Sequence, residues 1–118
     1  MKIVTAILVA RALAATAGIA AAQMEEGTAN FYGDKFQGKK TASGEVFDKN
    51  GLTASHKKLP FGTKVKVTNV ENGKSVVVTV NDRMAASNPA VIDVTRRAAE
   101  ELDFAKDGKA KVKVEVQK

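Results

Sequence analysis

The sequence of 118 residues contains no cysteine. Neither a disulfide framework nor a thiolate metal site can therefore hold the fold together, and a lipid-anchored cysteine is excluded as well. Aromatic residues make up only 5% of the chain. The lysines are scattered along expected strands, without the stacked aromatic side chains of a nucleic-acid platform. Nucleic acid is thus not expected as a partner, although the formal net charge is +6 and positive charge alone is compatible with it.

The first 22 residues have the composition of an export signal. Lys2 gives a positive start, residues 3–22 are dominated by alanine and aliphatic side chains, and Ala20 to Ala22 offer a cleavage site of small residues. The apolar run is too short and too rich in alanine for a membrane span, although Arg11 is a costly charge within it. We expect a signal peptide at 1–22, a short linker at 23–26 and one domain at 27–118. The mature domain is expected to be a periplasmic or secreted monomer with no stable membrane anchor.

The rest of the chain has the periodicity of short strands. Residues 63–70 alternate between apolar and polar side chains, and so do residues 111–116. Residues 75–80 are rich in β-branched side chains, and Asn72-Gly73 precedes them with the composition of a tight type I′ turn. These patterns predict a hairpin over residues 63–80 and a final strand over residues 111–116.

Only one helix is expected in this part of the chain. Thr95 can cap a helix that runs to about Leu102, with a narrow apolar stripe that includes Ala98 and Ala99, and Gly108 marks the turn that follows. Glycines interrupt residues 27–55 every few positions, which indicates short strands and turns. A single short helix argues against parallel β-α-β units. We expect a mainly β fold, which a small closed barrel would complete without exposed strand edges.

Five acidic or histidine residues are the candidates for chemistry: Glu45, Asp48, His56, Asp82 and Asp93. Each also has a plain structural interpretation. Glu45 and Asp48 suit a solvated turn, Asp82 could cap a loop or pair with Arg83, and Asp93 could lie at the positive end of the helix. His56, the single histidine, could be a hydrogen-bonded structural residue. Taken singly, none of them identifies a site.

Together with their surroundings, these segments resemble the rare lipoprotein A family of double-psi β-barrel proteins. This is the barrel of septal-ring lytic transglycosylases and, more distantly, of expansins. The resemblance extends from Gly27 to about Val116 and is carried by several motifs in order: GTANFYG at 27–33, KTASGEVF at 40–47, LTASHKKLPFGT at 52–63, VKVTN at 65–69, NGK at 72–74, VTVNDR at 78–83 and IDVT at 92–95.

The resemblance implies a six-stranded double-psi β-barrel with one short helix and a polar groove. It also implies an enzyme that cleaves peptidoglycan glycan strands and leaves 1,6-anhydro-muramyl ends. The functional positions of the family fall on the five candidates named above. Such a lyase needs one carboxyl group that protonates the glycosidic oxygen and then accepts the proton of the sugar's own C6 hydroxyl. No metal or cofactor is expected. Asp93 or Asp82 is the expected acid/base, because both adjoin apolar strands, and the choice between them stays open.

Substrate-binding positions are expected at Tyr32, Asn81 and Arg83. Tyr32 combines an apolar ring with a polar tip and suits a groove, whereas the phenylalanines at 31, 36, 47 and 61 are expected in the core. The family's usual Gly-Pro-aromatic continuation is replaced by residues 84–89, from Met84 to Pro89. This departure leaves an alternative: a non-catalytic glycan-binding or wall-loosening module on the same barrel. A basic envelope protein that binds an acidic protein, or acts as a secreted inhibitor, is a third interpretation and rests on charge and fold alone.

Overall fold

A computed structural model describes residues 24–117 of the chain. The expected export signal lies outside the described residues. Within them, no helix is both long and apolar enough to cross a membrane. The elements follow one another in this order: β1 (Met24–Phe31), the 3-10 helix η1 (Asp34–Phe36), β2 (Thr53–His56), β3 (Lys64–Asn69), β4 (Ser75–Arg83), β5 (Ile92–Val94), α2 (Arg96–Glu101) and β6 (Lys109–Val116).

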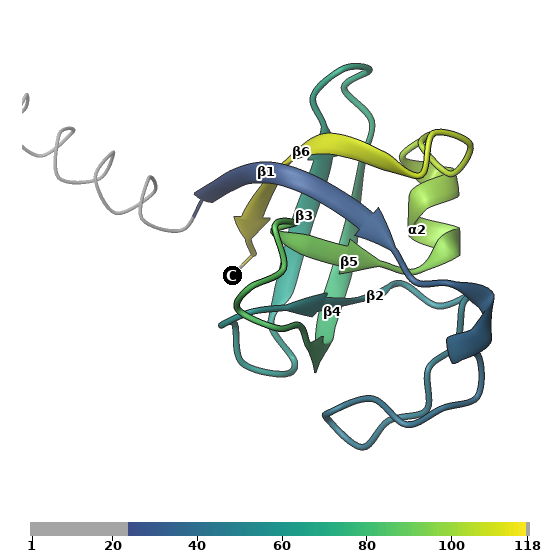
Figure 1. The fold of residues 1–118 in the computed structure, drawn as a ribbon. Helices are drawn as coiled ribbons and strands as arrows, with labels where there is room; N and C mark the ends of the chain where they lie inside the picture. The colour runs from purple at the N-terminus through teal and green to yellow at the C-terminus, as the bar shows by residue number, and fades with distance from the viewer. Residues whose placement is uncertain (1–23, 118) are drawn as a thin grey trace, which may run out of the picture.

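Six strands close into one barrel in the order β1-β5-β2-β4-β3-β6 (Figure 1). The pairs β1–β5 and β2–β4 are parallel, and the other four pairs are antiparallel. Closure leaves no strand edge exposed for pairing with another chain. The predicted mainly β barrel with one short helix is confirmed.

The core follows the alternation that the sequence predicts. Val65 and Val67 of β3 are fully buried, whereas Lys64 and Lys66 are exposed. The valines of β4 and β6 repeat the pattern from the neighbouring strands. Because successive side chains of a strand point to opposite faces, one face of each strand fills the barrel interior. The largest fully buried side chain is Phe104, which follows α2 and packs edge-on against Phe31.

Helix α2 begins where the sequence predicts. The Thr95 hydroxyl accepts a hydrogen bond from the Ala98 amide (3.2 Å) and donates one to the Gly51 carbonyl (2.6 Å). The cap therefore fixes the helix and also ties it to the segment that precedes β2. Ala98, Ala99 and Leu102 form the buried stripe of the helix, and a positive φ of 82° at Gly108 makes the turn before β6.

Two local predictions are wrong. Residues 24–26, expected within a linker, belong to β1 and pair with residues 113–115 of β6. The β3–β4 hairpin has no type I′ turn, because Gly73 (φ 76°) has a positive φ and Asn72 does not. Instead, the Gly73 amide donates to the Asn69 carbonyl (2.8 Å), and the Asn69 side chain accepts from Glu71. The Asn69 side-chain amide also donates to the Leu102 carbonyl. A contact from outside the hairpin therefore helps to fix the conformation of its loop, which local composition alone does not predict.

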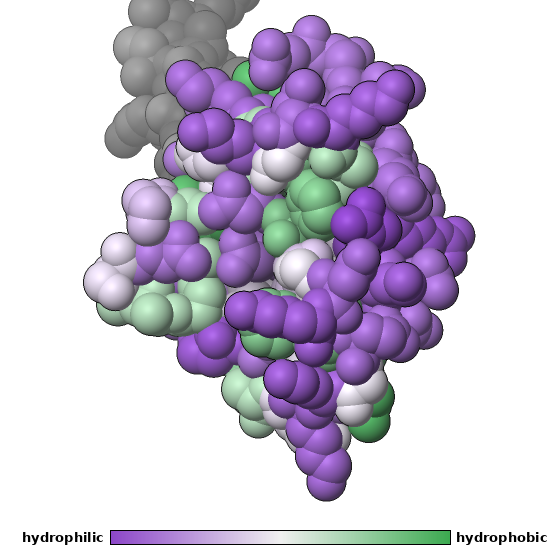
Figure 2. Space-filling model, turned by 45° about the vertical axis from the view of Figure 1, so that its right-hand side comes forward, coloured by the Kyte–Doolittle hydropathy of each residue, from purple (hydrophilic) through white to green (hydrophobic). Residues whose placement is uncertain are grey.

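The segment between β1 and β2 projects from the barrel (Figure 1). It contains η1 and an isolated bridge between Lys40 and Val46, and Phe47 anchors it as its one buried residue. The view that brings the α2 side of the barrel forward is mostly hydrophilic, with small separate apolar areas (Figure 2). This visible face therefore has no large apolar patch of the kind that marks an obligate interface.

Candidate functional site

A row of polar residues crosses four neighbouring strands of the barrel. Asn30 of β1 lies opposite Asp93 of β5, Asp93 lies opposite Ser55 of β2, and Ser55 lies opposite Asp82 of β4. Residues that are opposite one another in register present their side chains to the same face of a sheet. These four residues line one groove of about 340 Å³, together with Tyr32, Phe36 and residues of the loop after β4.

A β-bulge brings Asp82 into this row. Ala54 pairs with Val80, but the next residue, Ser55, pairs with Asp82, so Asn81 is the extra residue of β4. Val80 and Asn81 are both buried, and the normal alternation resumes at Asp82. Bulges commonly redirect a side chain beside a functional site. Here the extra residue determines which β4 side chain faces the groove.

Asp82 is held by three hydrogen bonds. The Tyr32 hydroxyl donates to Oδ2 (2.7 Å), and the amides of Ala42 and Arg83 donate to Oδ1 (2.8 and 2.9 Å). Three donors around one side chain suit an ionised carboxylate, whose charge strengthens each bond. Asp82 therefore does hold a loop amide, that of Ala42, as one structural interpretation suggested, but among the described residues it forms no ion pair with the Arg83 guanidinium. It is a fixed negative charge on the groove wall.

Asp93 has the opposite environment. Its Oδ1 atom is buried and has no hydrogen-bond partner among the described residues. Burial, with the neighbouring charge of Asp82, raises the pKa of Asp93 above its usual value of 3.8. Both causes disfavour a second negative charge in the groove. Asp93 is therefore the carboxyl group of the pair that retains a proton more readily.

Tyr32 connects the groove to the projecting segment. Burial, and the hydrogen bond to Asp82, raise the pKa of Tyr32 far above its usual range, so the hydroxyl remains a donor. The ring packs against Phe47, with centroids 4.3 Å apart, and edge-on against Phe36 at 5.9 Å.

Phe47 is buried as predicted, and Phe31 is half-buried against the core. The predictions for Phe36 and Phe61 are wrong, since these residues are 38% and 44% exposed.

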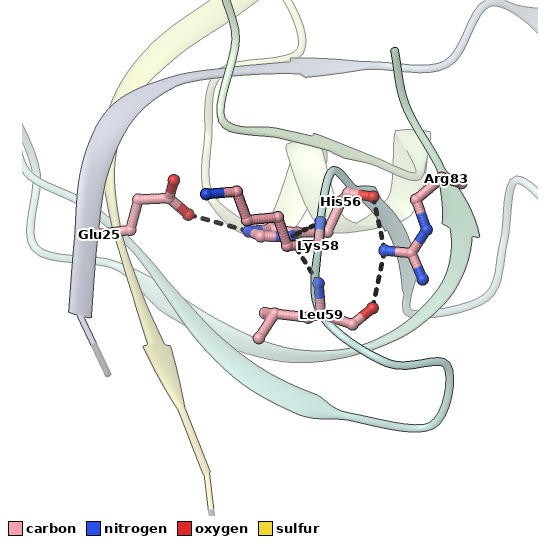
Figure 3. A network of polar contacts seen from close by, with 5 residues as sticks. All are labelled: Glu25, His56, Lys58, Leu59 and Arg83. Carbon is pink, nitrogen blue, oxygen red and sulfur yellow. Dashed lines mark hydrogen bonds and ion pairs between the residues drawn. The ribbon is translucent and has the colours of Figure 1, made fainter. Parts of the chain in front are cut away.

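His56 faces a different part of the molecule. Its Nε2 lies 2.9 Å from Glu25 Oε1, and its Nδ1 accepts from the amides of Lys58 and Leu59 (Figure 3). The ring lines a second pocket, with Met24 and Leu59 among its neighbours, and is not among the residues that line the groove of Asp82 and Asp93.

Glu45 and Asp48 lie on the projecting segment, and both are exposed. The Asp48 carboxylate accepts from the Asn50 amide (2.9 Å), as an ordinary turn residue does. Neither residue lines the groove. Of the five candidates, the structure therefore brings together Asp82 and Asp93, and places the other three elsewhere.

The expected binding residues Asn81 and Arg83 flank Asp82 and differ in their exposure. Asn81 is buried, and its side-chain oxygen has no partner among residues 24–117. Arg83 lines the groove. The loop that departs from the family pattern forms another wall, since Met84, Ala85 and Asn88 line the groove as well. Within this loop, Asn88 accepts a hydrogen bond from the Ala90 amide (2.9 Å).

Sequence reasoning missed several groove residues, among them Asn30, Ser55 and the exposed ring of Phe36. Asn30 and Ser55 join the site through strand register and through the bulge. Neither is visible in the spacing of residues that lie far apart in the chain. The sequence around Phe36 could have indicated its exposure, because Phe36 lies among glycines and lysines of an irregular segment, where a core residue is not expected.

Comparison with known proteins bears on both fold and family. The family model described as "Lytic transglycolase" matches residues 24–114. The endolytic peptidoglycan transglycosylase RlpA of Rickettsia bellii is 55% identical over 94 residues, which cover 77% of this chain and 41% of that protein. The RlpA of Pseudomonas aeruginosa (strain UCBPP-PA14) is 53% identical over 89 residues, which cover 75% of this chain and 26% of that protein. The chain thus matches less than half the length of these relatives.

Solved structures show the same fold at low sequence identity. A Streptomyces papain inhibitor superposes with a TM-score of 0.65 and 20% identity, covering 81% of this chain and 96% of that one. An expansin of Clavibacter michiganensis gives a TM-score of 0.64 and 18% identity, covering 80% of this chain and 50% of that one. The matched residues 24–114 contain the whole barrel and the groove of Asp82 and Asp93, and this chain belongs to the lytic transglycolase family of double-psi β-barrel domains.

Proposed function

We propose that this chain is an endolytic peptidoglycan transglycosylase, which cleaves glycan strands and leaves 1,6-anhydro-muramyl ends. The names of the family and of the relatives support this activity. The observation that carries it is the pair of carboxyl groups in one groove. Asp93 is half-buried, with one buried carboxyl oxygen and a raised pKa, and Asp82 is held as a charge by three donors. Two carboxyl groups in contrasting environments can divide acid and charge-stabilising roles.

In this proposal Asp93 is the general acid and then the general base. Protonated Asp93 gives its proton to the glycosidic oxygen as the bond from that oxygen to the anomeric carbon breaks. The Asp93 carboxylate then accepts the proton of the C6 hydroxyl, while the C6 oxygen forms its bond to the anomeric carbon. The acid is regenerated, and no water is consumed. A raised pKa suits the first step, because the group must be protonated when substrate binds.

Asp82 and Tyr32 support that chemistry. A fixed carboxylate on the groove wall stabilises positive charge that develops at the anomeric carbon. The Tyr32 hydroxyl holds that carboxylate at 2.7 Å, and packing against Phe47 fixes the Tyr32 ring. The negative charge of Asp82 also raises the pKa of Asp93. One carboxylate therefore serves both the protonation state of the acid and the transition state.

The exposed side chains around the pair are proposed to bind the sugar polymer. Phe36 lines the groove with an exposed ring, and Lys35 lies 5.3 Å from its centroid. An exposed aromatic face suits the apolar face of a sugar ring. Glu45 and Asp48, on the exposed segment beside η1, are proposed to contact the polymer away from the cleaved bond.

The site of action follows from the substrate. Peptidoglycan lies outside the cytoplasmic membrane, and the signal-like composition of residues 1–22 supports export. We place the domain in the periplasm or outside the cell, as a monomer without a stable membrane anchor.

A non-catalytic glycan-binding module is the second candidate. The observation that favours it is the loop from Met84 to Pro89, which departs from the family pattern and contributes Met84, Ala85 and Asn88 to the groove wall. A changed wall can retain binding while it disturbs the placement of the bond to be cleaved.

One experiment separates the two candidates. The purified protein is incubated with peptidoglycan, both intact and stripped of stem peptides, and soluble products are analysed by mass spectrometry while bound protein is measured by sedimentation. The enzyme proposal predicts 1,6-anhydro-muramyl products from at least one substrate. Binding to both substrates without such products would instead identify a binding module.

A further inference from the structure

Both ring nitrogens of His56 are already engaged within the protein. Nδ1 accepts from the amides of Lys58 (3.0 Å) and Leu59 (3.1 Å), and Nε2 lies 2.9 Å from Glu25 Oε1 (Figure 3). The residue is only 5% exposed. A histidine in this state has no free nitrogen for a substrate.

The contacts also define which ring nitrogen of His56 carries the proton. A nitrogen that accepts from two amides must carry its lone pair, so Nδ1 is unprotonated. The neutral ring then has its proton on Nε2, which donates to Glu25. The charged groups at the ring are Glu25 of β1 and Lys58 of the turn, and the rest of this pocket is apolar. His56 is thus bonded as an acceptor on one side and a donor on the other.

The turn that His56 organises holds an arginine of the groove. Arg83 Nη1 donates to the carbonyls of His56 (3.0 Å) and Leu59 (2.8 Å). Its guanidinium carbon lies 4.6 Å from the centroid of the Phe61 ring. The same His56 carbonyl accepts from the Met84 amide (3.3 Å), at the start of the loop that forms a groove wall. A single turn therefore fixes both Arg83 and the start of that loop.

We infer that His56 is a positioning residue for substrate binding: it fixes the turn over residues 57–61, so that the carbonyls of His56 and Leu59 and the Phe61 ring hold the Arg83 guanidinium at the groove. His56 transfers no proton in the reaction. Arg83, whose Nε and Nη2 have no hydrogen-bond partner among the described residues, offers these donors to an oxygen of the bound glycan. This inference rests on the proposed function of the groove of Asp82 and Asp93.

The first test measures the ring directly and does not depend on activity. His56 is the single histidine of the chain, so a protein labelled with nitrogen-15 at histidine gives the signals of one ring. The inference predicts one neutral tautomer near neutral pH, with the proton on Nε2. A proton on Nδ1, or a mixture of tautomers in rapid exchange, would overturn it.

The second test uses the affinity for a soluble glycan fragment, measured by calorimetry in an Asp93→Asn background so that turnover cannot interfere. His56→Ala removes the acceptor for the turn and should weaken binding roughly tenfold, the effect of one hydrogen bond to a charged group. His56→Asn keeps an acceptor oxygen near the position of Nδ1 and should retain most of the affinity. Arg83→Ala should weaken binding as His56→Ala does, and the double variant should be no weaker than Arg83→Ala alone. Arg97→Ala, at an exposed arginine that does not line the groove, is the matched control.

The outcomes separate this inference from the proposed enzyme activity. If wild-type protein binds glycan without cleaving it, the affinity pattern still supports the role of His56 while the enzyme proposal fails. Cleavage is measured separately, with the His56 variants made in protein that keeps Asp93. If both His56 variants bind glycan normally yet lose cleavage equally, His56 acts in the chemistry and the inference is wrong. Circular dichroism confirms that each variant is folded, and the conservative His56→Asn variant supplies the comparison if His56→Ala does not fold.

Discussion

Two aspartates of the same groove show how environment divides the roles of one residue type. Asp82 accepts three hydrogen bonds, two of them from backbone amides. Asp93 has a buried oxygen with no partner in residues 24–117, and its pKa is raised. The sequence placed both residues beside apolar strands and left open which of them is the acid. The difference depends on donors from Tyr32 and Ala42, which come from a segment whose fold the sequence does not reveal.

The contribution of the Tyr32 hydroxyl can be measured with Tyr32→Phe. The ring and its packing against Phe47 remain, but Asp82 loses one donor. A hydrogen bond to a charged group contributes about 1.5–3 kcal/mol, so kcat should fall by roughly one to two orders of magnitude. Initial rates of anhydro-product release are the measurement. A variant as fast as wild type would show that the Tyr32 hydroxyl does not support the site.

At the scale of elements, regular patterns were readable and irregular ones were not. Alternating valines predicted β3 and β6, a run of β-branched side chains predicted β4, and Thr95 predicted the start of α2. The bulge at Asn81 was not predictable, because it exists only in the pairing of β4 with β2. That single extra residue aligns Asp82 with Ser55 and Asp93. The site therefore depends on a feature of two strands together, whereas the periodicity of each strand can be read separately.

Thr95 offers a test of how strongly α2 is attached. Its hydroxyl caps the helix and also donates to the Gly51 carbonyl, and the residue is fully buried. Thr95→Val keeps the shape and removes both bonds, so the free energy of unfolding should fall by about 1–3 kcal/mol. Urea denaturation measures this change. Thr28→Val, on the half-exposed face of β1, is the matched control and should change stability little. Equal effects of the two substitutions would contradict the role of the cap.

At the scale of the whole molecule, barrel closure separates polar residues that the sequence suggested would meet. Asp82 and Asp93 line one groove, the His56 ring lines a second pocket, and Glu45 and Asp48 lie on the exposed projecting segment. The family resemblance predicted the barrel and the residue types. It did not show on which face of the barrel wall each side chain lies, because a one-residue change of register moves every side chain of a strand to the opposite face.

The groove also has a cost for the stability of the molecule. The pKa of Asp93 is higher in the folded protein than its usual value of 3.8, so the folded state binds the proton more tightly than the unfolded state. This tighter proton binding stabilises the folded state fully below pH 3.8, and the stabilisation is lost as the pH rises through the folded-state pKa of Asp93. Asp93→Asn, which cannot ionise, should therefore be more stable than wild type above that pKa. Thermal melts from pH 3 upward should show a Tm difference that grows in favour of the variant. A Tm difference that moves in favour of wild type as the pH rises would contradict this prediction.

The most direct test of the account is the rate of 1,6-anhydro-muramyl product formation by Asp93→Asn. Asp107→Asn is its control, because Asp107 is an exposed carboxylate that does not line the groove. If Asp93 is the acid/base, Asp93→Asn should bind peptidoglycan and release anhydro products at least about a hundredfold more slowly than wild type, the usual contribution of general acid–base catalysis, while Asp107→Asn keeps the wild-type rate. An Asp93→Asn variant that cleaves as fast as wild type would contradict the account.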